Sequence, residues 1–339
     1  MNLNIIISSI AGMISSFTVT VIAVPLSSKL AYKFNIITPD IHKEGNPRIP
    51  SLGGLALLLG MLSSLLIQYV IAKEYGFEIL LFLGIITLAF IIGLLDDVKT
   101  LSGITKTLVT VLIITPVIVA YMYDPAKLNL GRPRVPILGQ LRLTIVYWFL
   151  LPLAIAGPAN AVNMLEAFNG VLPMTCGTIS GVIMISSALL DSSLGLIFGS
   201  SLLGALLGYY PYNKYPSKVF SGNNGSLLVG AALGGIAVLA RLEFVVMIAL
   251  LPHIINALCV VVSIKGFKEK SKIKIPPVIM TSDYKLRANE DSKAPVTLTR
   301  AILLITGPLS EKEIVNVFFY LEMVASFLAL VSSIMMVIM

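Results

Sequence analysis

Two adjacent aspartates are the residues of this sequence best suited to chemistry. Asp96 and Asp97 close an apolar run in the segment GLLDDVKTLSGITK. In a helix they would lie at the C-terminal end, whereas the helix dipole stabilises anions at the N-terminal end, by about 0.3 to 1 kcal/mol. A bound cation would relieve this conflict, and Mg²⁺ is the natural candidate because it binds one or two carboxylates together with water and phosphate. The alternative is a solvated pair beside Lys99 and Lys106.

A second polar segment, GPANAVNMLEAFNG at 157–170, contains two asparagines three residues apart. Asn160 and Asn163 would share one face of a helix. An asparagine can bind a hard cation through its carbonyl oxygen or read a nucleobase edge through its amide. Helix capping and hydrogen bonding between membrane helices explain such asparagines equally well, so both interpretations stay open.

Two further segments could bind phosphate. In FSGNNGS at 220–226, two glycines allow close backbone approach and the helix start that follows favours an anion, although alone this spacing is more typical of an ordinary loop. In GFKEKSKIKIPP, lysines at every second position would lie on one side of an extended chain, as suits a diphosphate. A basic loop drawn to anionic lipid is the alternative. These lysines are Lys268, Lys270, Lys272 and Lys274.

The elements that must position these segments are membrane helices. Of 339 residues, 57% are apolar and 12% charged, whereas a soluble domain carries about a quarter charged residues. This excludes a soluble globular enzyme, a disordered chain and a disulfide scaffold. We expect an all-α polytopic membrane protein, one domain over 1–339, with ten charge-free stretches long enough to span a bilayer. These stretches are 1–28, 49–72, 79–95, 107–123, 143–165, 167–190, 192–213, 219–240, 244–264 and 323–339.

The distribution of basic residues predicts the orientation of the chain. With the N-terminus outside, the loops that face inward hold 18 of the 24 Lys and Arg, as the positive-inside rule requires. The four polar segments, including a long loop at 265–312, then lie on the cytoplasmic face, and both termini lie outside. The outer loop at 124–143 opposes the rule locally with three arginines, and its apolar alternation broken by Gly and Pro is compatible with a β-hairpin.

Charge and metal-ligand patterns exclude several other functions. The formal charge of +7 gathers in loops beside a membrane, so we expect anionic headgroups and phosphorylated ligands as partners, and no nucleic acid. Cys176 and Cys259 are isolated in apolar spans. His42 and His253 lack the spacing of a zinc site, and no serine-hydrolase motif is present. We expect His253 to be a hydrogen-bonded membrane histidine rather than a ligand.

The order of the four polar segments resembles that of the polyprenyl-phosphate N-acetylhexosamine-1-phosphate transferases, ten-span enzymes that start glycan assembly. IPSLGG at 49–54 looks like the entry to the family's second span, and the match runs over nearly the whole chain. KIKIPP followed by LTRAILLITGPLSEKE is similar to the eukaryotic and archaeal branch, which acts on dolichyl phosphate. The resemblance implies transfer of GlcNAc-1-phosphate from UDP-GlcNAc to dolichyl or another polyprenyl phosphate, with release of UMP.

The resemblance also implies a setting and a cofactor for this reaction. The product would start the assembly of an N-glycan or related glycan in an archaeal plasma membrane or the endoplasmic reticulum, with membrane lipids as partners. Mg²⁺ would be the cofactor, with Mn²⁺ as the alternative. Family members often form dimers, so a homodimer is compatible with the resemblance.

Catalytic and metal-binding roles are carried over residue by residue. By resemblance, Asp96 and Asp97 are the active-site pair and Lys106 assists the phosphates. The metal ligands would be Asp97, Asn163 and Asn223.

Substrate binding is carried over in the same way. Asn163 would also contact phosphate, Asn169 and Phe220 would hold the uracil, and Lys272 and Lys274 would grip the diphosphate.

Two positions depart from the family pattern. Asn223 follows Gly222 where the family has Gly-Asp, and Ser51 stands where the dolichyl branch tends to carry an acidic residue. The first change removes a negative charge from the expected metal site. A catalytically impaired homologue is therefore one alternative function. The other is a nucleotide-sugar or ion transporter, which would use the aspartates and asparagines as an ion site in the middle of the membrane.

Overall fold

Helices make up most of the chain in the computed structural model, which describes residues 2–128, 130–264, 266 and 275–338. The α-helices are α1 (Leu3–Lys33), α2 (Gly53–Ile71), α3 (Gly76–Val98), α4 (Gly103–Val111), α5 (Thr115–Tyr123), α6 (Thr144–Leu165), α7 (Val171–Leu189), α8 (Ser193–Asn213), α9 (Gly222–Leu239), α10 (Glu243–Ala249), α11 (Leu251–Ser263), α12 (Leu298–Thr306) and α13 (Glu311–Ile338). The 3-10 helices are η1 (Lys73–Tyr75), η2 (Leu112–Ile114) and η3 (Pro125–Lys127). The strands are β1 (Ile37–Pro39), β2 (Arg48–Pro50), β3 (Arg134–Val135), β4 (Gly139–Gln140), β5 (Val278–Met280) and β6 (Leu286–Ala288).

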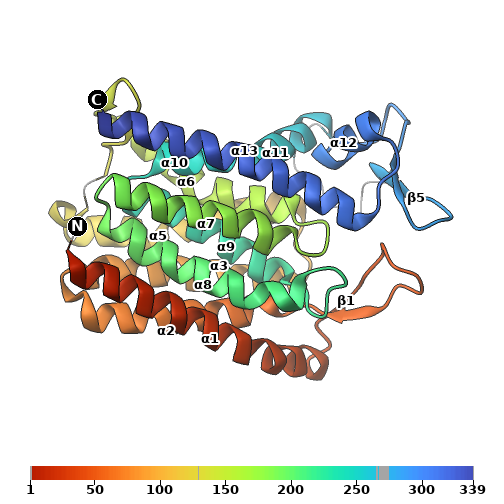
Figure 1. The fold of residues 1–339 in the computed structure, drawn as a ribbon, viewed down its shortest axis with the longest axis horizontal. Coiled ribbons are helices and arrows are strands. Elements are labelled where there is room, and N and C mark those ends of the chain that lie inside the picture. The colour runs from red at the N-terminus through yellow and green to blue at the C-terminus, as the bar shows by residue number, and fades with distance from the viewer. Residues whose placement is uncertain (1, 129, 265, 267–274, 339) are drawn as a thin grey trace.

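The long helices form one bundle of membrane spans. Among the described residues, nine helices are long and apolar enough to cross a membrane, and the bent pair α10–α11 makes a tenth if it crosses as one span. The two chain termini lie at one end of the bundle, called here the terminal end, and the β1 and β5 hairpins lie at the other, the far end (Figure 1). The prediction of an all-α polytopic membrane protein with about ten spans is confirmed.

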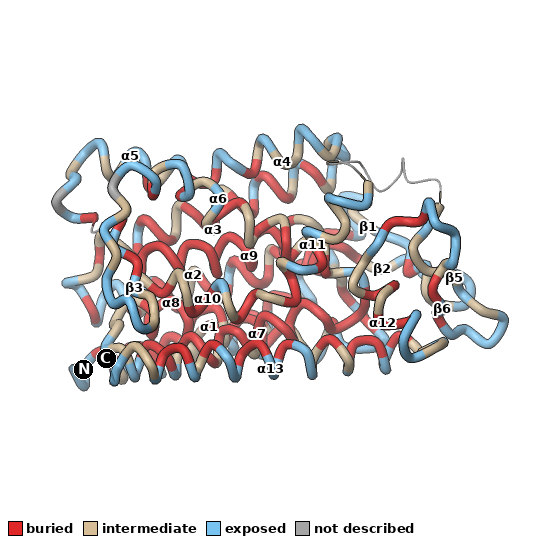
Figure 2. Tube along the Cα trace, turned by 90° about the horizontal axis from the view of Figure 1, so that it is seen from above, coloured by how far each residue is buried: buried red, intermediate tan, exposed pale blue. Residues whose placement is uncertain are grey.

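The centre of the bundle is α9. In this span 89% of the residues are buried, against 22% in the span Gly103–Tyr123, and Figure 2 shows α9 enclosed by other helices. Glycines allow the close packing. A Cβ on Gly230 would lie 2.4 Å from the carbonyl oxygen of Pro158 in α6, and a Cβ on Gly93 in α3 would lie 2.4 Å from that of Asn223. The N-terminus of α9 is therefore held firmly beside the C-terminus of α3.

The ninth span differs from its prediction. We predicted one span at 244–264, whereas α10 and α11 meet at Leu250 with a bend of 68°. Pro252 lies in the first turn of α11, where its missing N–H is harmless, but its ring prevents α10 from continuing as a regular helix.

The last span is longer than predicted. We expected 323–339, whereas α13 begins at Glu311 and includes Glu322. The side chain of Glu322 is fully buried, and its Oε2 lies 3.4 Å from Nδ1 of His253. A carboxylate that faces a partner inside the bundle does not end a membrane helix, so the rule of charge-free stretches placed this boundary wrongly.

Three antiparallel hairpins complete the described part of the fold. β3 pairs with β4 in the 124–143 loop, where a hairpin was expected. β1–β2 precedes α2, and β5–β6 lies with α12 in the 265–312 loop. Both of these hairpins lie at the far end (Figure 1), and β2 adjoins the segment before α9, because the N–H of Phe220 donates to the carbonyl of Pro50 at 2.8 Å.

Candidate active site

The two aspartates of the sequence motif lie in the last turn of α3 at the far end. Asp96 is buried, with 4% of its surface exposed. One carboxylate oxygen, Oδ1, accepts a hydrogen bond from the backbone N–H of Leu101 at 2.7 Å, and Oδ2 lies 2.7 Å from Nζ of Lys106. The chain thus turns back after α3, so that Lys106 in α4 neutralises Asp96.

Asp97 is bound by the first turn of α9. Its Oδ1 accepts hydrogen bonds from the backbone N–H and the side-chain amide of Asn223, both at 2.9 Å. Its Oδ2 accepts from the backbone N–H of Asn224 at 2.9 Å and from that residue's side-chain amide. Unpaired N–H groups at a helix start stabilise an anion. The unfavourable position of Asp97 on its own helix is therefore compensated by the N-terminus of another helix, which sequence spacing did not indicate.

Gly222 makes this contact sterically feasible. Its φ is +69°, a conformation that favours glycine, and a Cβ there would lie 2.7 Å from the carbonyl oxygen of Ser51 and 2.8 Å from Oδ2 of Asp97. The same loop pairs with the start of α2, because the N–H of Gly53 donates to the carbonyl of Phe220 at 2.9 Å. The two family-like motifs at 49–54 and 220–226 therefore pack directly against each other.

Asn223 joins the remaining helices into one network. Its Oδ1 accepts hydrogen bonds from Nζ of Lys106 at 2.6 Å and from the amide of Asn163 at 2.8 Å. Asn163 also donates to the hydroxyl of Ser226 at 2.7 Å. The structure thus brings together five of the predicted residues, from α3, α4, α6 and α9. They are Asp96, Asp97, Lys106, Asn163 and Asn223.

Asn160, the other asparagine of the predicted pair, does not join this network. Asn160 donates to the hydroxyl of Thr110 at 2.8 Å and to the carbonyl of Ala156 at 2.8 Å. Its contacts are those of the alternative interpretation, hydrogen bonding within and between membrane helices. Asn160 and Asn163 therefore form a natural matched pair for mutagenesis.

A separate cluster at the far end holds Asn169. The side-chain amide of Asn169 donates to Oδ2 of Asp40 at 3.0 Å, and its backbone N–H donates to Oε1 of Glu311 at 2.8 Å. Lys43 forms ion pairs with both carboxylates. Sequence reasoning missed this cluster because its two acids come from the first loop and from the start of α13; the only local signal was the polar segment that precedes β2.

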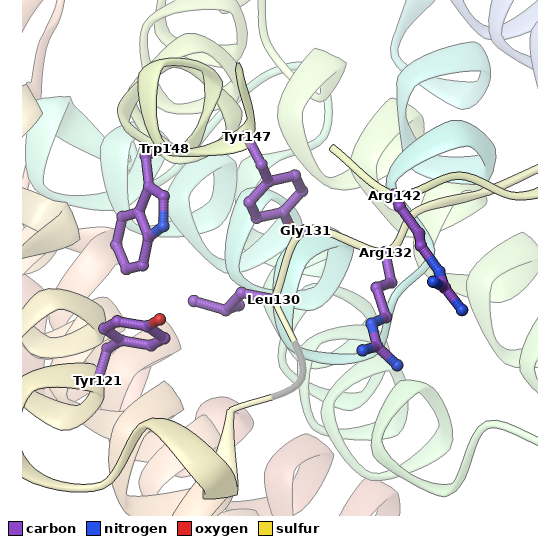
Figure 3. A pocket seen from close by; sticks show the side chains of 7 residues that line it. All are labelled: Tyr121, Leu130, Gly131, Arg132, Arg142, Tyr147 and Trp148. Atoms are coloured by element: carbon purple, nitrogen blue, oxygen red, sulfur yellow. The ribbon is translucent and has the colours of Figure 1, made fainter. Parts of the chain in front are cut away.

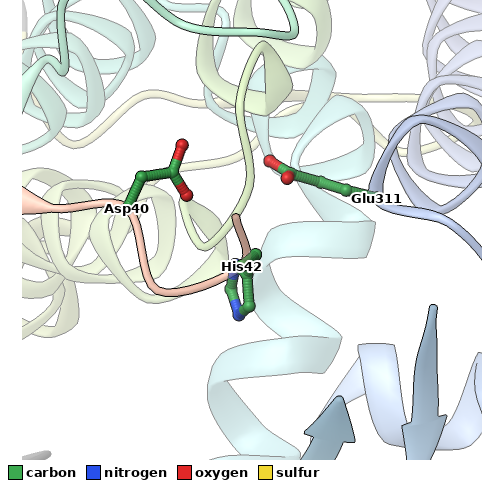
Figure 4. Close-up of side chains that lie close together, drawn as sticks. All are labelled: Asp40, His42 and Glu311. Atoms are coloured by element: carbon green, nitrogen blue, oxygen red, sulfur yellow. The ribbon is translucent and has the colours of Figure 1, made fainter. Parts of the chain in front are cut away.

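The spacing of the ligand atoms in this cluster would allow a metal ion, but the charge beside them opposes one. Ligand atoms of Asp40, His42 and Glu311 all lie within 4.8 Å of one another, and Figure 4 shows the two carboxylates beside the imidazole. However, the ammonium group of Lys43 already contacts both carboxylates and would repel a cation. Burial lowers the pKa of His42, against the opposing effect of the carboxylates, and the centre of its ring lies 5.1 Å from that of Phe168, with the rings tilted by 32°. These contacts favour a role in fixing Asn169.

The structure bears on the other predicted residues to different degrees. Lys272 and Lys274 lie outside the described residues. Phe220 borders the site through its backbone contacts to the start of α2. His253 is buried and lies 3.2 Å from the hydroxyl of Thr175, which confirms the expected hydrogen-bonded membrane histidine.

The fold and the site define an integral membrane protein with a charged, amide-rich site at one end of its helix bundle. Residues 79–241 match the family described as glycosyl transferase family 4. The phospho-N-acetylmuramoyl-pentapeptide-transferase of Halalkalibacterium halodurans is 30% identical over 276 residues, which cover 77% of this chain and 83% of that protein. A protein of Sulfolobus acidocaldarius, provisionally named UDP-N-acetylglucosamine–dolichyl-phosphate N-acetylglucosaminephosphotransferase, is 28% identical over 97% of this chain and 96% of its own length.

These similarities extend over most of the chain and include the residues of the network. The chain belongs to glycosyl transferase family 4, the membrane transferases that move a hexosamine-1-phosphate to a polyprenyl phosphate. The resemblance identified from the sequence motifs is confirmed at this level.

Proposed function

We propose that the protein transfers GlcNAc-1-phosphate from UDP-GlcNAc to dolichyl or a related polyprenyl phosphate and releases UMP. The observation that carries this proposal is the single network in which Asp96, Asp97, Lys106, Asn163 and Asn223 meet at the end of the bundle. The name of the Sulfolobus relative supports this sugar and lipid, whereas the muramoyl relatives are named for a different phosphosugar.

The network can supply positioning and charge neutralisation. The ammonium group of Lys106 lies between Oδ2 of Asp96 and Oδ1 of Asn223, so it places positive charge where a diphosphate would bind. A phosphate monoester has a second pKa of about 6 and is already largely dianionic at neutral pH. Its oxygen can attack the β-phosphorus directly while the bond to the UMP oxygen breaks, so alignment matters more than a strong base.

The donors of the network also fit Mg²⁺ by their chemistry. Carboxylate and amide oxygens are the hard ligands that Mg²⁺ or Mn²⁺ takes, and Asp97, Asn163 and Asn223 would hold the ion. When bound, the ion would neutralise the negative charge that develops on the diphosphate.

Asn169 is proposed to read the uracil, with Phe220 stacking on the ring. Asp40 and Glu311 fix the side chain and backbone of Asn169, so its carbonyl oxygen has a defined direction. By the positive-inside rule, we place this site on the cytoplasmic face. The network lies at the ends of α3 and α6 rather than at mid-span, which argues against an ion site in the middle of the membrane.

One observation favours a second candidate, a catalytically impaired homologue. Asn223 carries no charge, and its amide is engaged by Asp97, Lys106 and Asn163 at once. The polar atoms of Asn223 already have hydrogen-bond partners within the protein. A cation that binds there must replace these bonds, which weakens its binding.

The test is nucleotide release by the purified full-length chain with UDP-GlcNAc, dolichyl phosphate and Mg²⁺, in the presence and absence of chelator. Metal-dependent release of UMP together with a lipid-linked sugar supports the proposal, and release of UDP contradicts it. Asn163→Ala should lower turnover at least about tenfold, because it removes a direct contact to Asn223. The matched control, Asn160→Ala, should stay within about twofold of the wild type, since losing a hydrogen bond outside the site leaves the transition state unchanged.

A folded protein that binds UDP-GlcNAc but releases no UMP points to the impaired homologue. In that case Asn223→Asp should restore turnover. Failure of that variant as well would leave neither candidate standing for these substrates.

A further inference from the structure

A polar pocket lies at the terminal end, away from the aspartate network. Its volume is about 310 Å³, and it is an open hollow between the end of α5, the start of α6 and part of the loop that joins them (Figure 3). Its lining consists of Tyr121, Leu130, Gly131, Arg132, Arg142, Tyr147 and Trp148. Neither the family-like motifs nor the transfer reaction uses any of these residues.

The backbone of the loop fixes two positions directly opposite each other. Beyond the β3–β4 ladder, the N–H of Leu141 donates to the carbonyl of Pro133 at 3.0 Å, and the N–H of Leu143 donates to that of Gly131 at 2.8 Å. Such bonds define two hydrogen-bonded pairs that flank one non-hydrogen-bonded pair. In antiparallel strands the side chains of a non-hydrogen-bonded pair approach each other most closely.

The residues of that central pair are Arg132 and Arg142, and both side chains are exposed. Figure 3 shows their guanidinium groups near each other, on the other side of Leu130 and Gly131 from the rings of Tyr121 and Trp148. Like charges directly across a ladder are destabilising. A third guanidinium adds to the positive charge, because Nη2 of Arg241 donates to the carbonyl of Arg132 at 3.0 Å. The nearby carboxylate of Glu243 accepts a hydrogen bond from Tyr147 at 2.8 Å. An anion between the arginines would relieve their repulsion.

Phosphate is the anion that this arrangement fits best. Planar guanidinium groups bind phosphate oxygens in pairs and are more weakly hydrated than ammonium groups. The expected orientation puts this loop on the outer side of the membrane, where basic residues are uncommon. A cluster of arginines there calls for a specific partner.

The surroundings of the pocket place that phosphate at the membrane boundary. The rings of Tyr121 and Trp148 meet edge to face with their centres 4.4 Å apart, at the last turn of α5 and the second turn of α6. Aromatic residues of this kind gather at the level of lipid headgroups. Large apolar side chains beside them are widely exposed, with Met122 at 79%, Ile145 at 74% and Phe149 at 81%. The site therefore joins a cationic pocket to a surface for acyl chains.

We propose that this pocket binds the phosphate headgroup of an anionic membrane phospholipid. Arg132 and Arg142 hold the phosphate, the ring edges of Tyr121 and Trp148 contact the glycerol region, and the acyl chains follow the exposed face of α6. Free inorganic phosphate offers the same charge but no chains for that apolar surface. The proposal is independent of the transfer reaction at the far end.

Trp148 makes the test direct, because it is the single tryptophan of the chain. The full-length protein is reconstituted in phosphatidylcholine vesicles that contain increasing fractions of phosphatidylglycerol brominated near the headgroup end of its chains. Bromine quenches tryptophan fluorescence on contact. We expect saturable quenching at mole fractions about tenfold lower than with brominated phosphatidylcholine, as follows from two close cationic groups at an anionic lipid surface.

The double variant R132Q/R142Q should lose this preference, so that both brominated lipids quench equally. R48Q, a single change at an exposed arginine of β2 at the far end, is the charge control and should keep the preference. The emission spectrum of Trp148 in unbrominated vesicles checks that each variant keeps the folded pocket.

Equal quenching of the wild type by the two brominated lipids would overturn the proposal, as would a preference that survives in the folded double variant. In the last experiment, the quenching of the wild type is measured again with inorganic phosphate added at millimolar concentration. If it removes the preference completely at constant ionic strength, the pocket is a site for free phosphate, and the lipid assignment is wrong.

Discussion

The two ends of the bundle place like charges side by side but balance them in different ways. At the far end, Asp96 and Asp97 are matched by groups of the protein itself, namely Lys106 and the first turn of α9. At the terminal end, Arg132 and Arg142 face each other on a loop at the surface. Helix ends packed in a core can therefore satisfy their own charges, whereas the two arginines of the surface loop lie opposite each other and exposed.

Packing explains why the far end can do this. Gly93 lets α3 lie so close to the N-terminus of α9 that no side chain fits between them. The N–H groups of Asn223 and Asn224 then reach both oxygens of Asp97. These hydrogen bonds offset part of the cost of burying the charge, and they hold the carboxylate in place without further reorganisation.

The largest effect is expected from Asp97→Asn. The change removes a negative charge and turns one acceptor oxygen into a donor that faces the N–H groups of α9. Turnover measured as UMP release should fall at least about 100-fold, the scale of losing a preorganised electrostatic contact. Because the lipid phosphate needs no strong base, raising the pH should not restore activity. Full recovery at high pH with unchanged Mg²⁺ dependence would instead identify Asp97 as a general base.

Asn223→Asp should make the far end depend more strongly on a cation. The new carboxylate oxygen would face Oδ1 of Asp97, where an N–H donor now lies 2.9 Å away. The repulsion should lower thermal stability in chelator, and the Mg²⁺ concentration for half-maximal activity should fall about tenfold, because each added ligand charge tightens binding. An unchanged Mg²⁺ titration would show that residue 223 does not contact the ion.

Asp40→Ala should affect substrate binding more than turnover. It removes the acceptor that holds the side-chain amide of Asn169. The KM for UDP-GlcNAc should rise about tenfold with kcat within about twofold, in line with the loss of a hydrogen bond to a charged group. Steady-state kinetics of Glu243→Gln, a half-buried carboxylate at the terminal end, provide the control and should show an unchanged KM. An equal fall of kcat in the Asp40 variant would place Asp40 in the chemical step.

The smallest effect concerns pH. Burial keeps the pKa of His42 below its unfolded value of 6.5, so the unfolded chain binds more protons than the folded one as the pH falls through that range. Stability should therefore decrease below about pH 6.5, and His42→Gln should remove this part of the decrease, about 2 °C in melting temperature. Melting curves between pH 5 and pH 8 measure it. A His42→Gln curve parallel to the wild type would contradict the assignment.

Much of the architecture could be predicted from the sequence because the membrane restricts the choice. Backbone polar groups must be satisfied inside lipid, so long apolar stretches become helices, and their number and order follow from hydropathy. The same reasoning did not foresee the bend at Pro252, and it placed the start of the last span too late, just after Glu322. There a ring that prevents a regular helix, and a charge with a partner inside the bundle, outweigh average hydropathy.

The candidate site, too, could be predicted from the sequence only in part. The sequence by itself determined which residue types stand at the ends of α3, α4, α6 and α9, since motifs are local and their spacing is readable. Only the tertiary structure decided that α9 caps Asp97, that Glu311 reaches Asn169 and that Arg132 faces Arg142. These contacts join residues whose neighbourhood depends on helix packing and strand register. Both are set by the whole fold, and no local pattern encodes them.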